Sequence, residues 1–179
     1  MARLTKRDWL ITGIQLLAEQ GVPTLTIENL TNRLTVTKGS FYHHFKSFAD
    51  YKTALLELYE QEGTLNVIEL TEHQPSAAAK IDTLIDVVCG SEPILEIVLR
   101  AWALQDDEVR QVQARIDVRR ITYLQEVYFA LTGDETQALI RAQLAYTIVV
   151  GSAQLQPPLP PAALRQLLNE LTRVYQVAS

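Results

Sequence analysis

The stretch that decides the fold is Thr35-Val-Thr-Lys-Gly-Ser-Phe-Tyr-His-His-Phe45. Its two phenylalanines, Phe41 and Phe45, are four residues apart, so they share one helical face that we expect to be buried. Most of its other side chains carry a hydrogen-bond donor, which suits contact with phosphates and base edges. The stretch therefore predicts a short DNA-reading helix from about Lys38 to Phe45, capped by Thr37.

Two helices are expected before this one. Thr26 is a good N-cap for a short helix that has Glu28 in its first turn and ends near Leu34. An earlier helix from about Thr5 to Gln20 carries an apolar stripe and is stopped by Gly21. Two short helices joined by a brief turn are the arrangement that a helix-turn-helix needs to enter a DNA groove.

The rest of the chain also reads as helix, since alternating runs that would indicate strands are rare. We predict an all-α protein with an N-terminal three-helix helix-turn-helix domain over residues 1–47. Residues 48–179 are expected to form a C-terminal helical bundle. Proline, glycine and aspartate positions divide that bundle into helices at about 48–72, 76–89, 93–104, 106–132, 134–155 and 161–177.

Charge is distributed unevenly along the chain. The net charge is −5. Residues 1–50 hold six Lys/Arg and four acidic residues, whereas residues 51–179 hold ten Lys/Arg and seventeen acidic residues. A head of charge +2 can approach DNA while a body of charge −7 is repelled by it.

Other functional classes find little support. No apolar run reaches the ~20 residues that span a bilayer, and no cleavable signal opens the chain, so we expect a cytoplasmic protein without a membrane partner. The single cysteine, Cys89, excludes an intramolecular disulfide and a cysteine zinc site. His43 and His44 are adjacent, so they point ~100° apart on a helix and cannot chelate one ion. Without a nucleotide-binding or catalytic motif we expect no enzyme, no cofactor and no metal.

Residues 9–46 resemble the N-terminal domain of the TetR family of transcriptional regulators. The family pattern appears here as Gly21, Thr26-Ile-Glu-Asn-Leu30, Arg33 and Thr37-Lys-Gly-Ser-Phe-Tyr-His-His-Phe45. The resemblance implies a homodimeric regulator, most often a repressor, that binds a palindromic double-stranded DNA operator. It also implies that residues 48–179 are a ligand-binding and dimerisation domain, and that a small-molecule effector weakens DNA binding.

The DNA contacts expected from this stretch combine charge, hydroxyls and a planar face. Lys38 supplies charge, Gly39 leaves room for the backbone to come close, and Tyr42 offers an aromatic face with a polar tip. The full set of candidate DNA-binding residues is Thr26, Thr37, Lys38, Gly39, Ser40, Tyr42, His43 and Lys46.

The chain departs from the family pattern at two positions. Thr35 stands in the turn where the family often has glycine, which questions the usual left-handed geometry there. Phe48 stands where the family often has a lysine that touches phosphate. One phosphate contact fewer predicts weaker and more salt-tolerant DNA binding.

Helix 134–155 is apolar on nearly all sides in its second half, and the last helix carries leucines at helical spacing. These two helices from each of two subunits could therefore form a four-helix dimer interface. A bundle within one chain is the alternative. Dimer candidates are Ala138, Ala142, Ala145, Ile148, Leu164, Leu167, Leu168 and Leu171.

Aromatic residues in the body are candidates for an effector pocket, although ordinary core packing explains each of them as well. The candidates are Leu99, Trp102, Tyr123, Tyr128 and Tyr146. The sequence names neither the effector, the operator, the regulated genes nor the sign of regulation. The rival function is a helical dimeric module for ligand binding or protein interaction that has lost DNA binding.

Overall fold

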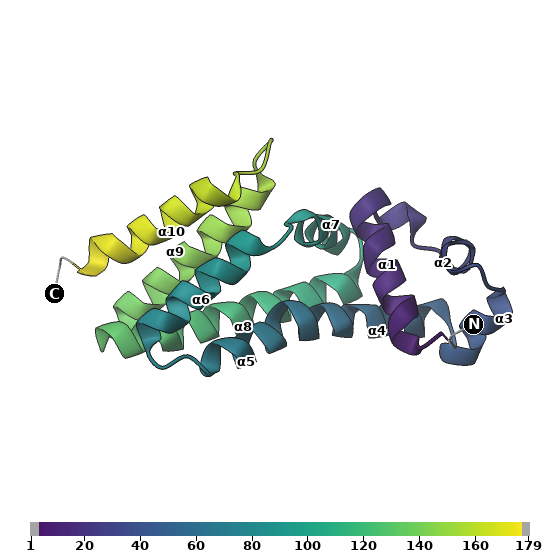
Figure 1. Cartoon of the computed structure of the whole chain (residues 1–179), viewed down its shortest axis with the longest axis horizontal. Coiled ribbons are helices and arrows are strands. Elements are labelled where there is room, and N and C mark those ends of the chain that lie inside the picture. The colour runs from purple at the N-terminus through teal and green to yellow at the C-terminus, as the bar shows by residue number, and fades with distance from the viewer. Residues whose placement is uncertain (1–3, 177–179) are drawn as a thin grey trace. The chain divides into compact units, whose positions relative to one another are not determined.

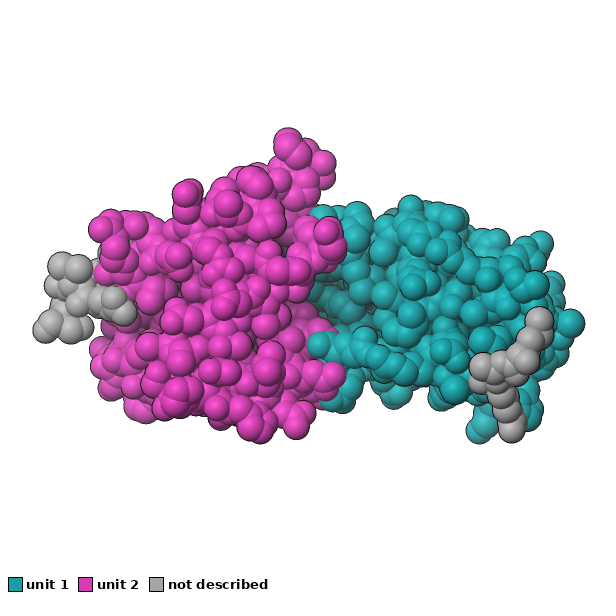
Figure 2. Space-filling view, in the orientation of Figure 1, with its two compact units in different colours: residues 1–62, 94–113 teal, residues 63–93, 114–179 magenta. Residues whose placement is uncertain are grey.

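The computed structural model describes residues 4–176, with side chains through residue 173, and within that part every regular element is a helix (Figure 1). The predicted all-α class is confirmed. The chain divides into two compact units, coloured separately in Figure 2. Unit 1 combines the N-terminal residues through Glu62 with Ile94–Gln113, and unit 2 combines Gly63–Pro93 with the residues from Ala114 onward.

Unit 1 is organised around its first helix, which packs against three others of the same unit. Its elements are α1 (Lys6–Gln20), the 3-10 turn η1 (Val22–Thr24), α2 (Ile27–Leu34), α3 (Lys38–His44), α4 (Phe48–Glu60), α7 (Ile94–Ala103) and the first residues of α8 (Asp107–Thr132). Helix α1 contacts α2, α4 and α7, and α2 contacts α3.

Helix α1 begins and ends where its sequence sets the signals. The hydroxyl of Thr5 accepts from the Asp8 backbone N–H at 3.3 Å, and the Asp8 carboxylate accepts from the Thr5 backbone N–H at 2.7 Å. This reciprocal pair satisfies backbone donors that the first turn would otherwise leave unbonded. The helix stops at Gly21, whose φ of 78° is accessible to glycine at little cost.

The α1–α4 contact requires a glycine. An added Cβ at Gly13 would lie 1.8 Å from the Tyr51 hydroxyl and 2.7 Å from Leu55 Cδ1. That close approach lets the buried Tyr51 hydroxyl donate to the Trp9 carbonyl at 3.1 Å. Burial raises the pKa of Tyr51 well above its usual range, so the phenol stays protonated and able to donate.

Unit 2 is a bundle in which α10 (Pro161–Gln176) runs beside α9 (Glu135–Gln154) and α6 (Ala77–Gly90), as Figure 1 shows. It also holds most of the π-turn η2 (Gln61–Leu65), helix α5 (Asn66–Glu72) and the larger part of α8. Its core is apolar and comes from four helices: Ile81, Ile85, Cys89, Tyr123, Val127, Tyr128, Ala138, Ala142, Ala145, Leu164 and Leu168.

The expected helix bounds agree with the structure to within a few residues, with one informative difference. We expected a single regular helix over residues 48–72, and the structure breaks it into α4, the π-turn and α5. A π-turn inserts a residue into the helical repeat and leaves backbone carbonyls with altered partners. One of these carbonyls, that of Gly63, accepts from Arg120 Nη2 at 3.2 Å.

Candidate nucleic-acid interface

The turn between α2 and α3 has the geometry of a helix-turn-helix. The Thr26 hydroxyl accepts from the Asn29 backbone N–H at 3.1 Å and caps α2, as expected. At the other end, Val36 N–H donates to the Thr31 carbonyl at 3.0 Å and Thr35 N–H donates to the Asn32 carbonyl at 3.2 Å. This pair of bonds is a Schellman motif, in which Thr35 takes the left-handed position at φ 55° and ψ 48°. The threonine therefore keeps the turn geometry that glycine usually provides.

The inner face of α3 is anchored by aromatic packing. Phe41 and Phe45 are 0% and 1% exposed, which confirms that they belong to the core. The ring of Phe41 meets Trp9 edge to face at 5.5 Å, and both phenylalanine rings lie within 5.6 Å of the Tyr51 ring. A helix of only seven residues cannot hold itself in water, so these contacts fix its position on unit 1.

The outer face of α3 carries the candidate DNA-binding residues. Tyr42 is 57% exposed although it is a large aromatic residue. The other exposed candidates are Thr26, Thr37, Lys38, Gly39, His43 and Lys46, whereas Ser40 is half-buried. The α2–α3 segment thus brings the set into one short stretch with its donors toward solvent.

The side chains of two of these candidates make no contact that holds the helix. Thr37 occupies the N-cap position of α3, as expected, but its hydroxyl makes no capping hydrogen bond. At Gly39 an added Cβ would meet only the Thr37 hydroxyl, at an ordinary contact distance of 3.6 Å. The fold therefore requires neither the Thr37 hydroxyl nor a glycine at position 39.

Sequence reasoning did not find the contacts that orient the head. Arg33 forms two bonds of 2.6 Å with Glu19, which tie the end of α2 to the end of α1. These bonds lower the pKa of the Glu19 carboxyl below its ordinary value. Lys6 Nζ lies 5.2 Å from the centre of the Phe45 ring, a cation–π distance. Charge spacing alone gave no signal for either contact because the partners are distant in sequence.

The start of α4 shows why phenylalanine is accommodated at position 48. Ser47 caps the helix, because its hydroxyl accepts from the Asp50 backbone N–H at 3.1 Å. Phe48 is half-buried, and its ring lies 5.9 Å from the Tyr51 ring. Its side chain therefore extends the aromatic cluster of unit 1.

The dimer candidates separate into two groups. Ala138, Ala142 and Ala145 on α9 are buried in the core of the single chain, together with Leu164 and Leu168 of α10. Ile148 and Leu171 pack partly against that core, while Leu167 is 46% exposed. A partner chain could therefore contact Leu167 directly. It could contact the five buried residues only if the bundle opened.

The five effector-pocket candidates are all buried, in two different units. Leu99 and Trp102 lie in unit 1, and the three tyrosines lie in unit 2. The Tyr123 hydroxyl donates to Glu72 Oε1 at 2.7 Å, and the Tyr146 hydroxyl donates to Asp117 Oδ1 at 2.7 Å.

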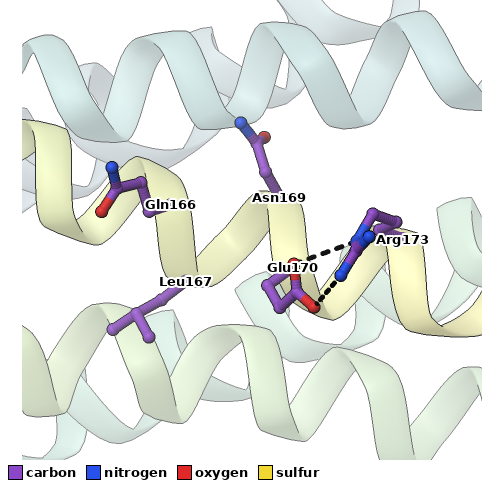
Figure 3. A pocket seen from close by; sticks show the side chains of 5 residues that line it. All are labelled: Gln166, Leu167, Asn169, Glu170 and Arg173. Atoms are coloured by element: carbon purple, nitrogen blue, oxygen red, sulfur yellow. Dashed lines mark hydrogen bonds and ion pairs between the residues drawn. The ribbon is translucent and has the colours of Figure 1, made fainter.

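An open hollow lies along α10, and none of these five residues lines it. It is lined by Gln166, Leu167, Asn169, Glu170 and Arg173. Figure 3 shows that Leu167 and Asn169 point to opposite sides of α10 and that Glu170 pairs with Arg173, at 2.6 Å. A shallow hollow of this kind resembles a contact surface more than an enclosed ligand site.

Within residues 4–176, no helix combines the length and apolarity needed to cross a membrane. No group of three or more His, Cys, Asp or Glu side chains among them is arranged to hold a metal ion.

Comparison with known proteins supports the resemblance found in the sequence. Residues 10–63 match the family described as bacterial regulatory proteins, tetR family. A stretch of 59 residues is 34% identical to the transcriptional regulator AcuR of Cereibacter sphaeroides. That stretch spans 33% of this chain and 27% of AcuR, so the chain matches only about a quarter of that relative.

Solved structures share the fold over nearly the whole chain. A putative transcriptional regulator of the TetR/AcrR family matches with a TM-score of 0.80 at 21% identity, covering 94% of this chain and 96% of its own. The reduced form of NemR from E. coli matches with a TM-score of 0.79 at 21% identity, and it covers 94% of this chain and 96% of its own. A putative regulator from Saccharomonospora viridis, in complex with choline, gives 0.80 at 14% identity over 94% and 95% of the two chains.

Proposed function

We propose that this chain, which carries the N-terminal domain of the tetR family on the fold of TetR/AcrR regulators, is a transcriptional regulator that binds DNA through α3. The observation that carries the proposal is the division of α3 into two faces. Phe41 and Phe45 anchor the helix in the core, while Tyr42, Lys38 and His43 face solvent. An exposed aromatic residue beside a lysine and hydroxyls suits a groove whose walls are phosphates.

DNA binding is tested by selecting bound duplexes from a random library and measuring their affinity by fluorescence anisotropy. We expect a recovered inverted repeat, and an affinity at least tenfold lower for Lys38→Ala and Tyr42→Ala. Lys80→Ala is the matched control, because Lys80 lies on α6 and pairs with Glu72 at 2.6 Å. Absence of any selected sequence would favour a ligand-binding or protein-interaction module instead.

Gly39→Ala is the sharpest variant of this set. The free protein has room for the added methyl group, so folding is expected to be unchanged or slightly improved. If the backbone of Gly39 approaches a phosphate closely, the same methyl group lowers DNA affinity. Unchanged affinity in this variant would count against a close approach of α3 to DNA at this residue.

We further propose a homodimer that uses the exposed side of α9 and α10. Ile140 and Leu144 lie one helical turn apart on α9 and are each 41% exposed, and Leu167 on α10 is 46% exposed. A dimer with a two-fold axis through this surface would carry two DNA-binding heads related by that axis. Such a pair matches the symmetry of a palindromic operator. Sedimentation of Leu144→Glu should show monomers, with loss of operator affinity. The control is Leu104→Glu, since Leu104 is 83% exposed in the turn that follows α7.

Repression and its release by a small molecule complete the proposal, and such a regulator would act in the cytoplasm. An effector can weaken DNA binding only if it binds the two conformations of the protein with different affinity. A reporter placed behind the selected operator gives the sign of regulation. Compounds that raise the melting temperature of the protein are then tested for release of operator DNA. The buried tyrosines of unit 2, Tyr123, Tyr128 and Tyr146, are the first positions to vary against any compound found.

A further inference from the structure

We propose that the Thr35 hydroxyl donates a hydrogen bond to a DNA phosphate, which makes Thr35 an additional DNA-contacting residue. The proposal rests on the proposed function, because it requires that α3 enters a DNA groove. Its starting point is the backbone of Thr35, which is left-handed at φ 55° and ψ 48°.

This conformation is unfavourable for threonine. A β-branched residue at positive φ is a genuine outlier, and such strain persists where the surrounding structure or a function requires it. Glycine takes the same position in the Schellman motif without strain, and the two backbone bonds that close the motif need no side chain at position 35. The motif accounts for the backbone geometry and leaves the choice of threonine unexplained.

Packing within the chain does not explain the threonine either. Thr35 is exposed, and within the described part of the chain its hydroxyl makes no hydrogen bond. The neighbouring threonines differ in this respect. The Thr26 hydroxyl accepts from the Asn29 backbone N–H at 3.1 Å, and the Thr31 hydroxyl donates to the Glu28 carbonyl at 2.8 Å.

The turn presents two such hydroxyls, separated in sequence by one residue. Thr37 is also exposed and its hydroxyl caps no helix, so Thr35 and Thr37 bracket Val36 with two donors that the fold leaves to solvent. Lys38 follows directly and is exposed as well. Threonine hydroxyls, lysines and backbone N–H groups are the donors that proteins use on DNA phosphates. The turn that leads into a groove-bound helix passes close to the sugar–phosphate backbone.

The test separates the hydroxyl from the backbone strain with three substitutions at one position. Thr35→Val keeps the β-branched shape and removes the hydroxyl, so we expect about tenfold weaker binding to the selected duplex. Thr35→Ser keeps the hydroxyl and should bind within about twofold of wild type. Thr35→Gly should unfold at higher urea than wild type because the strain is relieved, and yet bind DNA as weakly as Thr35→Val.

Salt dependence provides a second readout. A neutral hydroxyl releases no counterion, so Thr35→Val should keep the wild-type slope of log affinity against log salt, whereas Lys38→Ala should flatten it by about 0.9. The proposal is overturned if Thr35→Val binds like wild type, or if Thr35→Ser loses as much affinity as Thr35→Val. If Lys38→Ala and Tyr42→Ala lose affinity while Thr35→Val does not, only this inference fails. If none of these variants loses affinity, the proposed function fails with it.

Discussion

Arg120 Nε donates to the hydroxyl of Thr64 at 3.0 Å, which joins α8 to the π-turn within unit 2. The same guanidinium donates to the Gly63 carbonyl at 3.2 Å and lies 3.4 Å from the Tyr146 hydroxyl. Thr64 is only 2% exposed, so its hydroxyl depends on a partner inside the protein. One side chain therefore bonds to two consecutive residues of the π-turn, where the ordinary helical bonding pattern is interrupted.

Replacing Arg120 with methionine should destabilise unit 2. The Thr64 hydroxyl and the Gly63 carbonyl would lose a donor, and we expect the free energy of unfolding to fall by about 2 kcal/mol. Urea denaturation followed by circular dichroism measures the change. Arg110→Met on the same helix is the control, because its ion pair with Asp107 is exposed and should be worth less than about 1 kcal/mol. Equal losses in the two variants would show that the π-turn does not depend on Arg120.

The contact between α1 and α4 leaves no room for a methyl group at Gly13. Gly13→Ala places a methyl group 1.8 Å from the Tyr51 hydroxyl, so the helices must separate or Tyr51 must leave its hydrogen bond to Trp9. We expect a loss of about 3 kcal/mol in the free energy of unfolding, at the upper end of ordinary overpacking. Gly90→Ala is the matched control, since its added Cβ meets nothing within 4 Å. A Gly13→Ala protein as stable as the control would show that α1 and α4 pack less closely.

These residues show what the sequence could and could not predict. Caps and breakers are local, so Thr26 and Gly21 gave helix ends that the structure reproduces. Phe41 and Phe45 were correctly assigned to the core because their spacing puts them on one face. The sequence around the π-turn did not predict it. Its bond from Arg120 to Thr64 joins residues that are 56 positions apart in sequence.

Helical periodicity identifies a buried face without naming what covers it. The alanines of α9, Ala138, Ala142 and Ala145, suited either a dimer seam or the core of one chain. The structure places them in the core of unit 2, where small side chains let α9 lie close to its neighbours. The exposed residues Ile140 and Leu144 of the same helix were not among the predicted dimer residues.

Stability should depend on pH through the ion pairs of Lys52. Its ammonium lies 2.8 Å from Asp106 and 2.9 Å from Glu108. The bond from Lys52 holds the pKa of the Asp106 carboxyl below its ordinary value of 3.8. Bonds from Thr53 and then Lys52 hold the pKa of the Glu108 carboxyl below its ordinary 4.5.

A carboxyl with a lowered pKa in the folded state adds stability above its unfolded pKa, and this stability is lost as the pH falls through the folded value. The free energy of unfolding of wild type should therefore decline from about pH 5 downward. Lys52→Met should be less stable at pH 7, decline less steeply, and approach wild type at about pH 3. Urea titrations at these pH values test this. Lys46→Met, which alters an exposed lysine, should follow the wild-type profile; a Lys52→Met curve parallel to wild type would contradict the expected coupling.

The last prediction uses the departure at the start of α4. Phe48 is half-buried beside the Tyr51 ring. It carries no charge, whereas the family that this stretch resembles often has a lysine at the corresponding position. If that position faces a phosphate, Phe48→Lys adds one counterion-releasing contact. The slope of log affinity against log salt should then steepen by about 0.9, with tighter binding at low salt. Ala49→Lys is the matched control, because it adds the same charge at the next, exposed position. A slope that is unchanged in Phe48→Lys, or that steepens equally in both variants, would show that no phosphate lies opposite residue 48.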